Sequence, residues 1–362
     1  MPAIKAPTRD RYLLVCIASA QVGFGHLNRC LSLANVFRSH GADVDFVVFG
    51  DKKGQKLIQG FGYKCRKTNF DAAVDHNQVF TTNSLEHNHY LGVIVDVAHE
   101  SFLRRRSSIE TCLDVVRQVG EVLVFFDTIE ANSLTPQFPE ISIDIIVIPY
   151  VGVPRSVGKR KYILSGPKYA VLSDSFEGAR QYNYGRQEKN RILITCGGAD
   201  PQKLTLVILD AVESIPSRKE LRVIVGPFFP TQLAKKIRER IQGSSHNIME
   251  VQTPNSLAKH MNWCDLAIST SGLTKYELAA TGTPAILIAT DDNEFQVNRS
   301  FAALGSARHL HVGVTPEVIR SELCQLINDD VQLKMMSDAG MRMIDGMGAE
   351  RIFLKMDKMI HA

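Results

Sequence analysis

The chain reads YLLVCIASAQVGFGHLNRCLSLANVF from Tyr12 to Phe37. The apolar run at the start of this stretch predicts a buried strand, and the apolar spacing at its end predicts a helix. Between them, Gly23 and Gly25 allow positive φ and close backbone approach, and His26 stands where the helix would begin. Helix starts offer N–H groups and a positive dipole end, and ligands in open α/β sheets bind beyond the carboxyl ends of strands. We therefore expect His26 to face a cleft that suits an anionic substrate.

Strand-like and helix-like runs alternate along the whole chain, which is typical of parallel sheets wrapped by helices. We predict two α/β halves with a cleft between them: a first domain at residues 1–172, a polar linker at 173–190 and a second domain at 191–347. The segment 348–362 is expected to pack back on the first domain. The predicted strands are 12–17, 44–49, 92–96, 122–127, 143–148, 191–195, 221–225, 266–269 and 285–289, and the predicted helices are 31–37, 109–119, 203–214, 229–242, 274–281, 316–328 and 348–359.

The composition excludes several classes of protein. The chain has 362 residues, of which 44% are hydrophobic and 22% charged, enough for two cores. The net charge is only +4 and the basic runs 104–106 and 159–161 are short, which indicates solvated faces and no nucleic-acid partner. The seven cysteines are odd in number and lack a CxxC pair, which favours free thiols in a reducing compartment. No apolar leader core or membrane-length run occurs, so we expect a cytoplasmic protein with no integral membrane association.

Two further glycine-containing turns follow predicted strands in the second half. Gly197 and Gly198 expose backbone N–H groups that could hold a phosphate. The second turn could cradle a diphosphate through its hydroxyl and N–H groups, but a simple N-cap formed by Ser271 or Thr274 would explain the same residues. The residues of this second turn are Ser269, Thr270, Ser271, Gly272 and Thr274.

Acidic residues follow both of the last two strands. Glu277 lies one turn into the predicted helix and could accept hydrogen bonds from ribose hydroxyls, or it could be an exposed helix former. Asn293 and Glu294 belong to the segment 291–294, which we expect to be a polar loop at the carboxyl end of a strand.

Other polar patterns are not expected to form sites. Asp43 and Asp45 have the spacing used by metal-dependent sugar transferases, but they start a predicted strand at the wrong end of the sheet, so no metal is expected. No Walker loop occurs, and the dinucleotide fingerprint fails because no third glycine follows Gly25. The histidines expected to play no part are His87, His89, His309 and His311.

Several motifs occur in order across nearly the whole chain. They are Gln21-Val22-Gly23-Phe24-Gly25-His26 with Arg29, Gly166-x-x-Tyr169-Ala170 with Leu172, Gly197-Gly198-Ala199-Asp200, Ser269 to Glu277, Gly282-Thr283-Pro284, Asn293 and Gly305. On these motifs the chain resembles the UDP-sugar hydrolases of pseudaminic acid biosynthesis, which group with spore-coat polysaccharide proteins. More distantly it is similar to the lipid-linked glycosyltransferase of peptidoglycan synthesis. The resemblance implies a GT-B type fold, with two Rossmann-like domains whose parallel sheets face a central cleft.

The resemblance also implies roles for single residues. His26 would be the catalytic histidine, Glu277 would bind ribose, and the turn at 271–274 would hold the diphosphate of a UDP-sugar. The sugar-side pattern is broken after Asp96 and Asp127, which predicts the same nucleotide with a different sugar or acceptor. The residues expected to bind substrate or nucleotide are Gly23, Gly25, Arg29, Asp96, Asp127, Gly197, Gly198, Ser269, Ser271, Gly272, Thr274, Glu277, Asn293 and Glu294.

The predicted activity is hydrolysis of a nucleotide sugar in nonulosonic acid or surface polysaccharide biosynthesis. His26 would take a proton from water as it attacks the anomeric carbon, releasing UDP and a free acetamido-deoxy sugar without a metal or other cofactor. Two alternatives stay open at this point. One is an inverting glycosyltransferase of GT-B type that uses the same base on a hydroxyl acceptor, and the other is a nucleotide-sugar-binding protein without catalysis.

Overall fold

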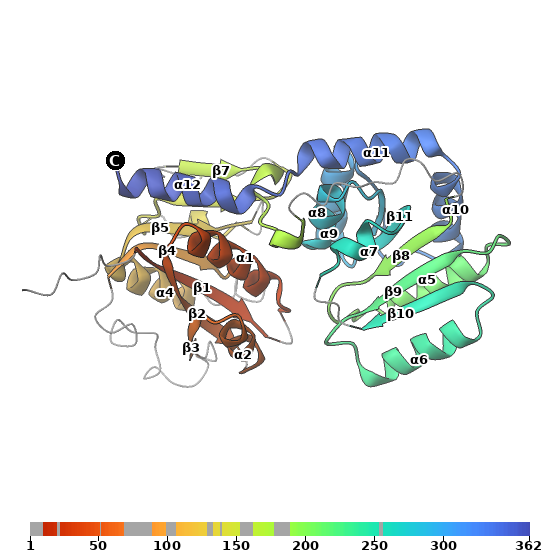
Figure 1. Ribbon diagram of the computed structural model, residues 1–362, viewed down its shortest axis with the longest axis horizontal. Helices are drawn as coiled ribbons and strands as arrows, with labels where there is room; N and C mark the ends of the chain where they lie inside the picture. The colour runs from red at the N-terminus through yellow and green to blue at the C-terminus, as the bar shows by residue number, and fades with distance from the viewer. Residues whose placement is uncertain are drawn as a thin grey trace, which may run out of the picture. The chain divides into compact units, whose positions relative to one another are not determined.

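The structure is a computed structural model, and it describes residues 10–19, 22–50, 52–68, 89–98, 106–128, 133–137, 140–152, 162–176, 189–252 and 256–362. Predictions about Gln21, His87, the two basic runs and most of the 173–190 linker lie wholly or largely outside these residues. The chain divides into two compact units (Figure 1). Unit 1 comprises Met1–Ser173 and Met347–Ala362, and unit 2 comprises Asp174–Gly346.

In the described part of unit 1, seven parallel strands form one sheet in the order β3-β2-β1-β4-β5-β6-β7. The strands are β1 (Arg11–Ala18), β2 (Asp43–Gly50), β3 (Lys64–Thr68), β4 (Tyr90–Asp96), β5 (Gly120–Phe126), β6 (Ile145–Ile148) and β7 (Tyr162–Ser165). The helices are α1 (Gly25–Ser39), α2 (Lys52–Gly60), α4 (Arg106–Val119) and α12 (Gly348–Ile360), with short helices η3 (Thr135–Gln137) and η4 (Pro167–Tyr169).

The two faces of this sheet are buried by different helices because successive strand residues point to opposite faces. On one face, Leu14 of β1 packs in a cluster with Phe37 of α1 and Phe353 of α12. On the other face, Val15 packs in a cluster with Leu113 of α4. Helix α12 therefore belongs to the core of unit 1, although its sequence follows the whole of unit 2.

In the described part of unit 2, six parallel strands form a sheet in the order β10-β9-β8-β11-β12-β13. They are β8 (Arg191–Thr195), β9 (Glu220–Val225), β10 (Asn247–Gln252), β11 (Leu266–Thr270), β12 (Ala285–Ile288) and β13 (Ala307–Leu310). The helices are α5 (Leu204–Glu213), α6 (Thr231–Gln242), α7 (Ala258–Met261), α8 (Thr274–Ala280), α9 (Asp292–Ala302), α10 (Pro316–Ile327) and α11 (Asp330–Met343), with the short helix η5 (Asp174–Phe176).

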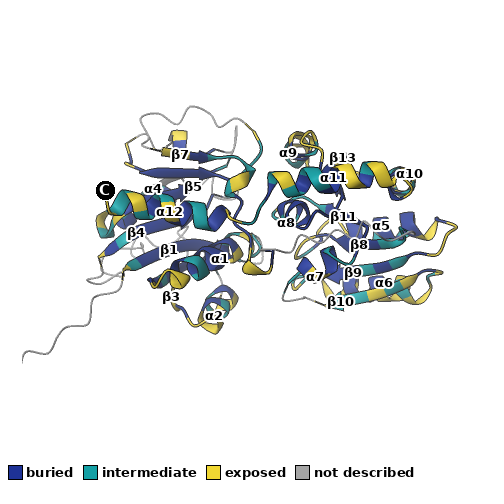
Figure 2. Ribbon diagram, turned by 45° about the horizontal axis from the view of Figure 1, so that its top comes forward, coloured by how far each residue is buried: buried dark blue, intermediate teal, exposed yellow. Residues whose placement is uncertain are grey.

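These elements confirm the predicted α/β class with two parallel sheets. Figure 2 shows mostly buried strands, with helices that present both buried and exposed residues. The sequence analysis missed β3, β7 and β10, which are all edge strands; edge strands are short and half-exposed, so they lack a long apolar run. It was wrong about the polar loop at 291–294, because Asp292 begins helix α9. It also missed α2, α7 and α11.

Strand order fixes where ligands can bind. In unit 1 the order reverses between the neighbours β1 and β4, and in unit 2 between β8 and β11. In open parallel sheets the crevice beyond the carboxyl ends of such neighbours is the usual ligand site. The loops after these four strands are therefore the ones to inspect. Within the described segments, no helix combines the length and apolar character needed to cross a membrane.

Candidate functional site

The turn between β1 and α1 places His26 in the first turn of the helix. Gly23 has φ +81°, and its N–H donates to the carbonyl of Ser19 at 2.7 Å, which folds the turn back on the strand end. The next residues enter α1, and Asn28 N–H bonds the carbonyl of Phe24 at 2.8 Å. The His26 side chain is 12% exposed, so it is packed at its base and still reaches solvent.

The His26 imidazole is oriented by a carboxylate from β4. Its Nδ1 lies 2.7 Å from Oδ1 of Asp96, which is the last residue of that strand. An ionised carboxylate only accepts hydrogen bonds, so Nδ1 carries the proton and Nε2 is the nitrogen able to take one. Arg29 Nη2 lies 3.3 Å from the same Nδ1, but its much shorter contact to Asp96 shows where it donates.

Arg29 holds Asp96 from the other side. Its Nε donates to Oδ2 and its Nη2 to Oδ1, both at 2.6 Å, in a bidentate pair that is almost wholly buried. Burial alone would raise the pKa of Asp96, but the charges and hydrogen bonds of Arg29 and His26 outweigh it and hold that pKa at about 2. Asp96 is therefore a permanent negative charge behind the imidazole. We call these three residues the His26–Asp96–Arg29 cluster.

Three of the residues expected to contact substrate have partners within the protein. Arg29 and Asp96 are both buried, and each is the main hydrogen-bonding partner of the other, so together they position the imidazole. Asp127 is also buried; its carboxylate accepts from the N–H groups of Thr128, Leu134 and Thr135 and from the hydroxyls of Ser133 and Thr135. A carboxylate with five donors has its acceptor sites filled. Asp127 thus organises the loop after β5.

In unit 2, three loops meet at the carboxyl edge of the sheet. Gly197 has φ +72°, and the carbonyl of Gly198 accepts from the N–H of Phe228 at 2.9 Å. A Cβ on Gly226 would lie 2.4 Å from that carbonyl oxygen, so these backbones pack too closely for a side chain. The Gln202 amide donates to the carbonyl of Thr290, which links the loop after β8 to the loop after β12. Gly197 and Gly198 are exposed.

The turn between β11 and α8 is built from a polar network. Ser271 Oγ donates to Oδ1 of Asn298 on α9 at 2.8 Å and accepts from Lys275 Nζ at 3.0 Å. Its hydroxyl hydrogen is thus already used, and no side chain caps α8. Gly272 has φ +88° and is exposed, with no atom within 4 Å of where its Cβ would be. The backbone of this turn, and not the hydroxyl of Ser271, is what an oxyanion could reach.

The other predicted residues of unit 2 divide by exposure. Ser269 is 0% exposed, and its hydroxyl donates to the carbonyl of Thr270. Glu294 accepts from the N–H and hydroxyl of Thr290, and its own N–H donates to the side chain of Asp291, the residue that caps α9. Asn293 is exposed, and Thr274 is half-buried at the start of α8.

Glu277 is a half-buried carboxyl on α8. Burial raises its pKa to about 7. No hydrogen bond or ion pair joins its carboxylate to another described residue. A desolvated carboxylate that lacks donors is suited to accept hydrogen bonds from the hydroxyls of a ligand, as the ribose role requires.

Glu277→Gln is expected to weaken UDP binding about tenfold, since a hydrogen bond to a charged group contributes about 1.5–3 kcal/mol.

The same substitution should change the pH dependence of stability. The pKa of Glu277 is raised in the folded state, so its ionisation costs stability as pH rises from the ordinary pKa of 4.5 to about 7. The variant should therefore be more stable than the wild type at pH 8 and equal to it below pH 4.5. Calorimetric titration and urea unfolding measure both effects. Glu239→Gln, at a side chain of α6 that is 60% exposed, is the matched control. A Glu277→Gln variant that is less stable than the wild type at pH 8 would contradict this account.

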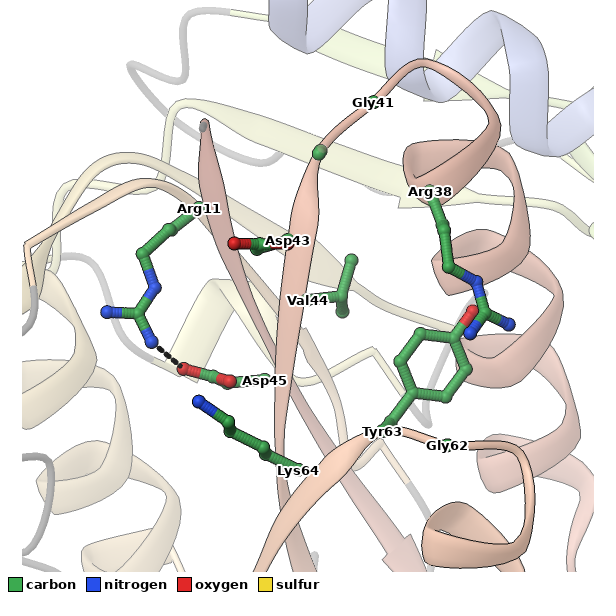
Figure 3. A pocket seen from close by; sticks show the side chains of 10 residues that line it. Arg11, Arg38, Gly41, Asp43, Val44, Asp45, Gly62, Tyr63 and Lys64 are labelled. Carbon is green, nitrogen blue, oxygen red and sulfur yellow. Dashed lines mark hydrogen bonds and ion pairs between the residues drawn. The ribbon is translucent and has the colours of Figure 1, made fainter. Parts of the chain in front are cut away.

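The hollow in Figure 3 lies at the other end of the unit 1 sheet. It has a volume of about 310 Å³ and is lined by residues at the amino-terminal ends of β1, β2 and β3, including Arg11 and Lys64. Asp43 and Asp45 point to the same side of β2, and Asp45 is bonded to Arg11 at 2.7 Å and to Tyr90 at 3.0 Å. Within the described segments no three His, Cys, Asp or Glu side chains are grouped as a metal site would need.

Comparison with known proteins adds to this geometry. Residues 191–351 match the glycosyltransferase family 28 C-terminal domain. The spore coat polysaccharide biosynthesis protein SpsG of Bacillus subtilis is 27% identical over 194 residues, which cover 52% of this chain and 56% of that protein. The chain thus spans just over half the length of this relative.

Two solved structures are similar over nearly the whole chain. MurG of Acinetobacter baumannii has a TM-score of 0.70 at 13% identity, over 97% of this chain and 99% of that one. HepE of Anabaena, solved in complex with UDP and glucose, has a TM-score of 0.60 at 13% identity, over 97% and 100%. The fold is GT-B. Together with the family 28 match, this supports a glycosyltransferase-like protein, as the motif resemblance implied, and does not extend to the hydrolase.

Two residues that contact the β11–α8 turn were not predicted from the sequence. Lys275 and Asn298 contact the β11–α8 turn; Lys275 lies within the motif Ser269 to Glu277 but was given no role, and Asn298 lies outside the motifs. One signal was available: a lysine four residues after Ser271, on a helix whose other residues are mostly apolar, is placed to reach back to that turn.

Proposed function

We propose that this protein is a nucleotide-sugar-dependent glycosyltransferase in which His26 is the general base and unit 2 binds the nucleotide. The observation that carries the proposal is the 2.7 Å contact between His26 Nδ1 and Asp96. It fixes the tautomer in which Nε2 can accept a proton from an attacking hydroxyl. The family 28 match of unit 2 favours transfer to a hydroxyl acceptor over hydrolysis.

The chemistry follows from the residues present. The acceptor hydroxyl attacks the anomeric carbon while His26 takes its proton, and the carbon–oxygen bond to the diphosphate breaks. Asp96 stabilises the imidazolium that forms, and Arg29 keeps Asp96 ionised and in place. A single displacement inverts the anomeric centre. The leaving diphosphate is weakly basic and needs charge stabilisation more than protonation, for which the backbone N–H groups at Gly197–Gly198 and Gly272 are candidates.

Several observations support UDP-sugar as the donor. The resemblance implies UDP, and HepE, which shares the fold, was solved with UDP and glucose. Glu277 offers the acceptor that ribose hydroxyls need. Because SpsG is named for spore coat polysaccharide biosynthesis, we place the product in surface polysaccharide synthesis.

Hydrolysis is the second candidate, since water can replace the hydroxyl acceptor and the motif resemblance favours it. The test incubates the protein with UDP-, GDP- and CMP-linked acetamido sugars, with and without a pool of sugar and sugar-lipid acceptors, and follows nucleotide release and products. We expect release that requires an acceptor, with a new glycosidic product of inverted configuration. Free sugar formed equally without acceptor would establish the hydrolase. Nucleotide binding with no turnover of any donor would contradict both.

A further inference from the structure

A lysine is buried under the β11–α8 turn. Lys275 is 3% exposed, and its ammonium lies 3.0 Å from Ser271 Oγ and 3.5 Å from Asn298 Oδ1. The rings of Tyr276 and Phe301 have their centres 5.5 and 5.7 Å from Nζ. No carboxylate of the described residues forms an ion pair with it. Lysines are almost never buried without such a partner, because desolvating the charge is costly.

The polar groups around this lysine have more donors than acceptors. Lys275 has three N–H donors, and the two oxygens it reaches are already shared, because Ser271 also donates to Asn298 Oδ1. The Nδ2 group of Asn298, on a side chain that is 0% exposed, has no partner among the described residues. An unsatisfied buried donor of this kind calls for an explanation. The imbalance indicates that the cluster lacks an oxygen-rich, negatively charged group.

The space beside the cluster suits such a group. Gly272 lies one residue beyond Ser271, is exposed, and meets nothing within 4 Å where a Cβ would project. The turn is thus open on the solvent side at Gly272 and has an ammonium beneath it. In a poorly solvated setting a buried charge acts on a nearby anion more strongly than an exposed one.

We propose that Lys275, held by Ser271 and Asn298, is a specificity-determining residue that sets the preference of the β11–α8 turn for a nucleoside diphosphate over less charged ligands. The inference rests on the proposed function of unit 2 as the nucleotide-binding unit. Lys275 acts as the buried counter-charge of the diphosphate, and Asn298 fixes its position. A bound diphosphate supplies the negative charge that the free protein does not place next to this ammonium.

Protonation of Lys275 is then linked to binding. Burial lowers the pKa of Lys275 to about 8, although the negative charge of Glu294 offsets part of this lowering. A bound diphosphate favours the charged form, so UDP binding near pH 8 should take up protons and weaken as pH rises. The strands β11 and β12 beside α8 have no charged side chain. The charged residues on the other packed elements are Asp292, Glu294 and Arg299 of α9, Asp330, Lys334, Asp338 and Arg342 of α11, and Glu277 on α8 itself.

The test measures UDP, UMP and uridine binding to the full chain by calorimetry. Lys275→Met should weaken UDP about tenfold or more, as expected for loss of a charged contact, and leave uridine unchanged. Asn298→Asp keeps the shape and gives Lys275 an internal carboxylate partner, so it should keep the fold and lose UDP affinity in the same way. Lys235→Met, at a lysine that is 77% exposed on α6, is the matched control. Wild-type titrations at pH 8 in buffers of different ionisation enthalpy should reveal proton uptake that Lys275→Met abolishes.

The outcomes distinguish failure of the Lys275 inference from failure of the proposed function of unit 2. If UDP binds and both variants bind UDP like the wild type, or lose UDP and uridine equally, Lys275 is structural and the inference is wrong. If wild-type protein binds none of UDP, GDP and dTDP, the proposed function of unit 2 fails, and this inference fails with it. Proton uptake by the wild type supports the inference even where a variant fails to fold, and its absence contradicts it.

Discussion

His26→Asn is expected to lower kcat about 10²- to 10⁴-fold, the contribution of a positioned general base, while Kd for UDP stays unchanged. The substitution removes Nε2 as a proton acceptor and keeps a side-chain amide that Asp96 can bind. The proposed function assigns nucleotide binding to unit 2, so ground-state binding of UDP should not change. Steady-state rates and calorimetric Kd values for UDP, measured on the same samples, give the two quantities.

His89→Asn is the control for this experiment. His89 is 67% exposed, and its Nδ1 lies 3.5 Å from a carboxylate oxygen of Glu121, which is 45% exposed. It should show wild-type rates. Normal turnover in His26→Asn with intact UDP binding would remove the imidazole from the mechanism and leave another base to be found.

Asp96→Asn is expected to lower the free energy of unfolding by about 3–5 kcal/mol, because it leaves the Arg29 guanidinium buried without a counter-charge. It should also lower kcat, since the imidazolium loses its stabilising charge. Urea unfolding measures the stability. Asp96→Asn with Arg29→Met removes both charges, and should recover most of the stability without recovering the rate. Recovery of both would show that Asp96 is needed only for folding.

Because Arg29 and Asp96 form an ion pair, the stability loss expected for Asp96→Asn depends on pH. The pKa of Asp96 is lowered from 3.8 to about 2, so its contribution to stability is complete above its ordinary pKa and is lost as pH falls toward 2. The stability difference between wild type and Asp96→Asn should therefore shrink over this interval. A difference that stays constant down to pH 2 would show that the ion pair does not set the pKa.

The sequence could predict what depends on local pattern. Apolar runs located the buried strands, and the glycines before His26 located the turn, because both are encoded by neighbouring residues. The contact between His26 and Asp96 spans 70 residues and depends on β1 lying next to β4. Strand order is set by the packing of the whole sheet, so no local spacing could reveal that Asp96 orients the imidazole.

Three residues of the predicted site have partners within the protein, and the physical reason is shared. Asp127, Ser269 and Glu294 each follow or end a strand, which is where ligand-binding residues lie, but the loops that follow also need acceptors for their own backbone N–H groups. Asp127 and Glu294 serve that need, and Ser269 is enclosed by the strand. A residue at the carboxyl edge of a sheet is predicted to lie near a ligand. Whether its side chain contacts the ligand depends on whether its hydrogen-bonding groups already have partners within the protein.

Helix α12 carries a consequence for how the protein is made. The ring centre of Phe353 lies 4.9 Å from that of Phe37 on α1, the helix that carries His26 in its first turn. Ile352 and Met356 are fully buried in the same cluster. Nascent chains emerge from the ribosome at about 5–20 residues per second, with N-terminal domains usually folding first. Here unit 1 needs residues that are translated after the whole of unit 2, so α1 gains its final cover only once unit 2 has been synthesised.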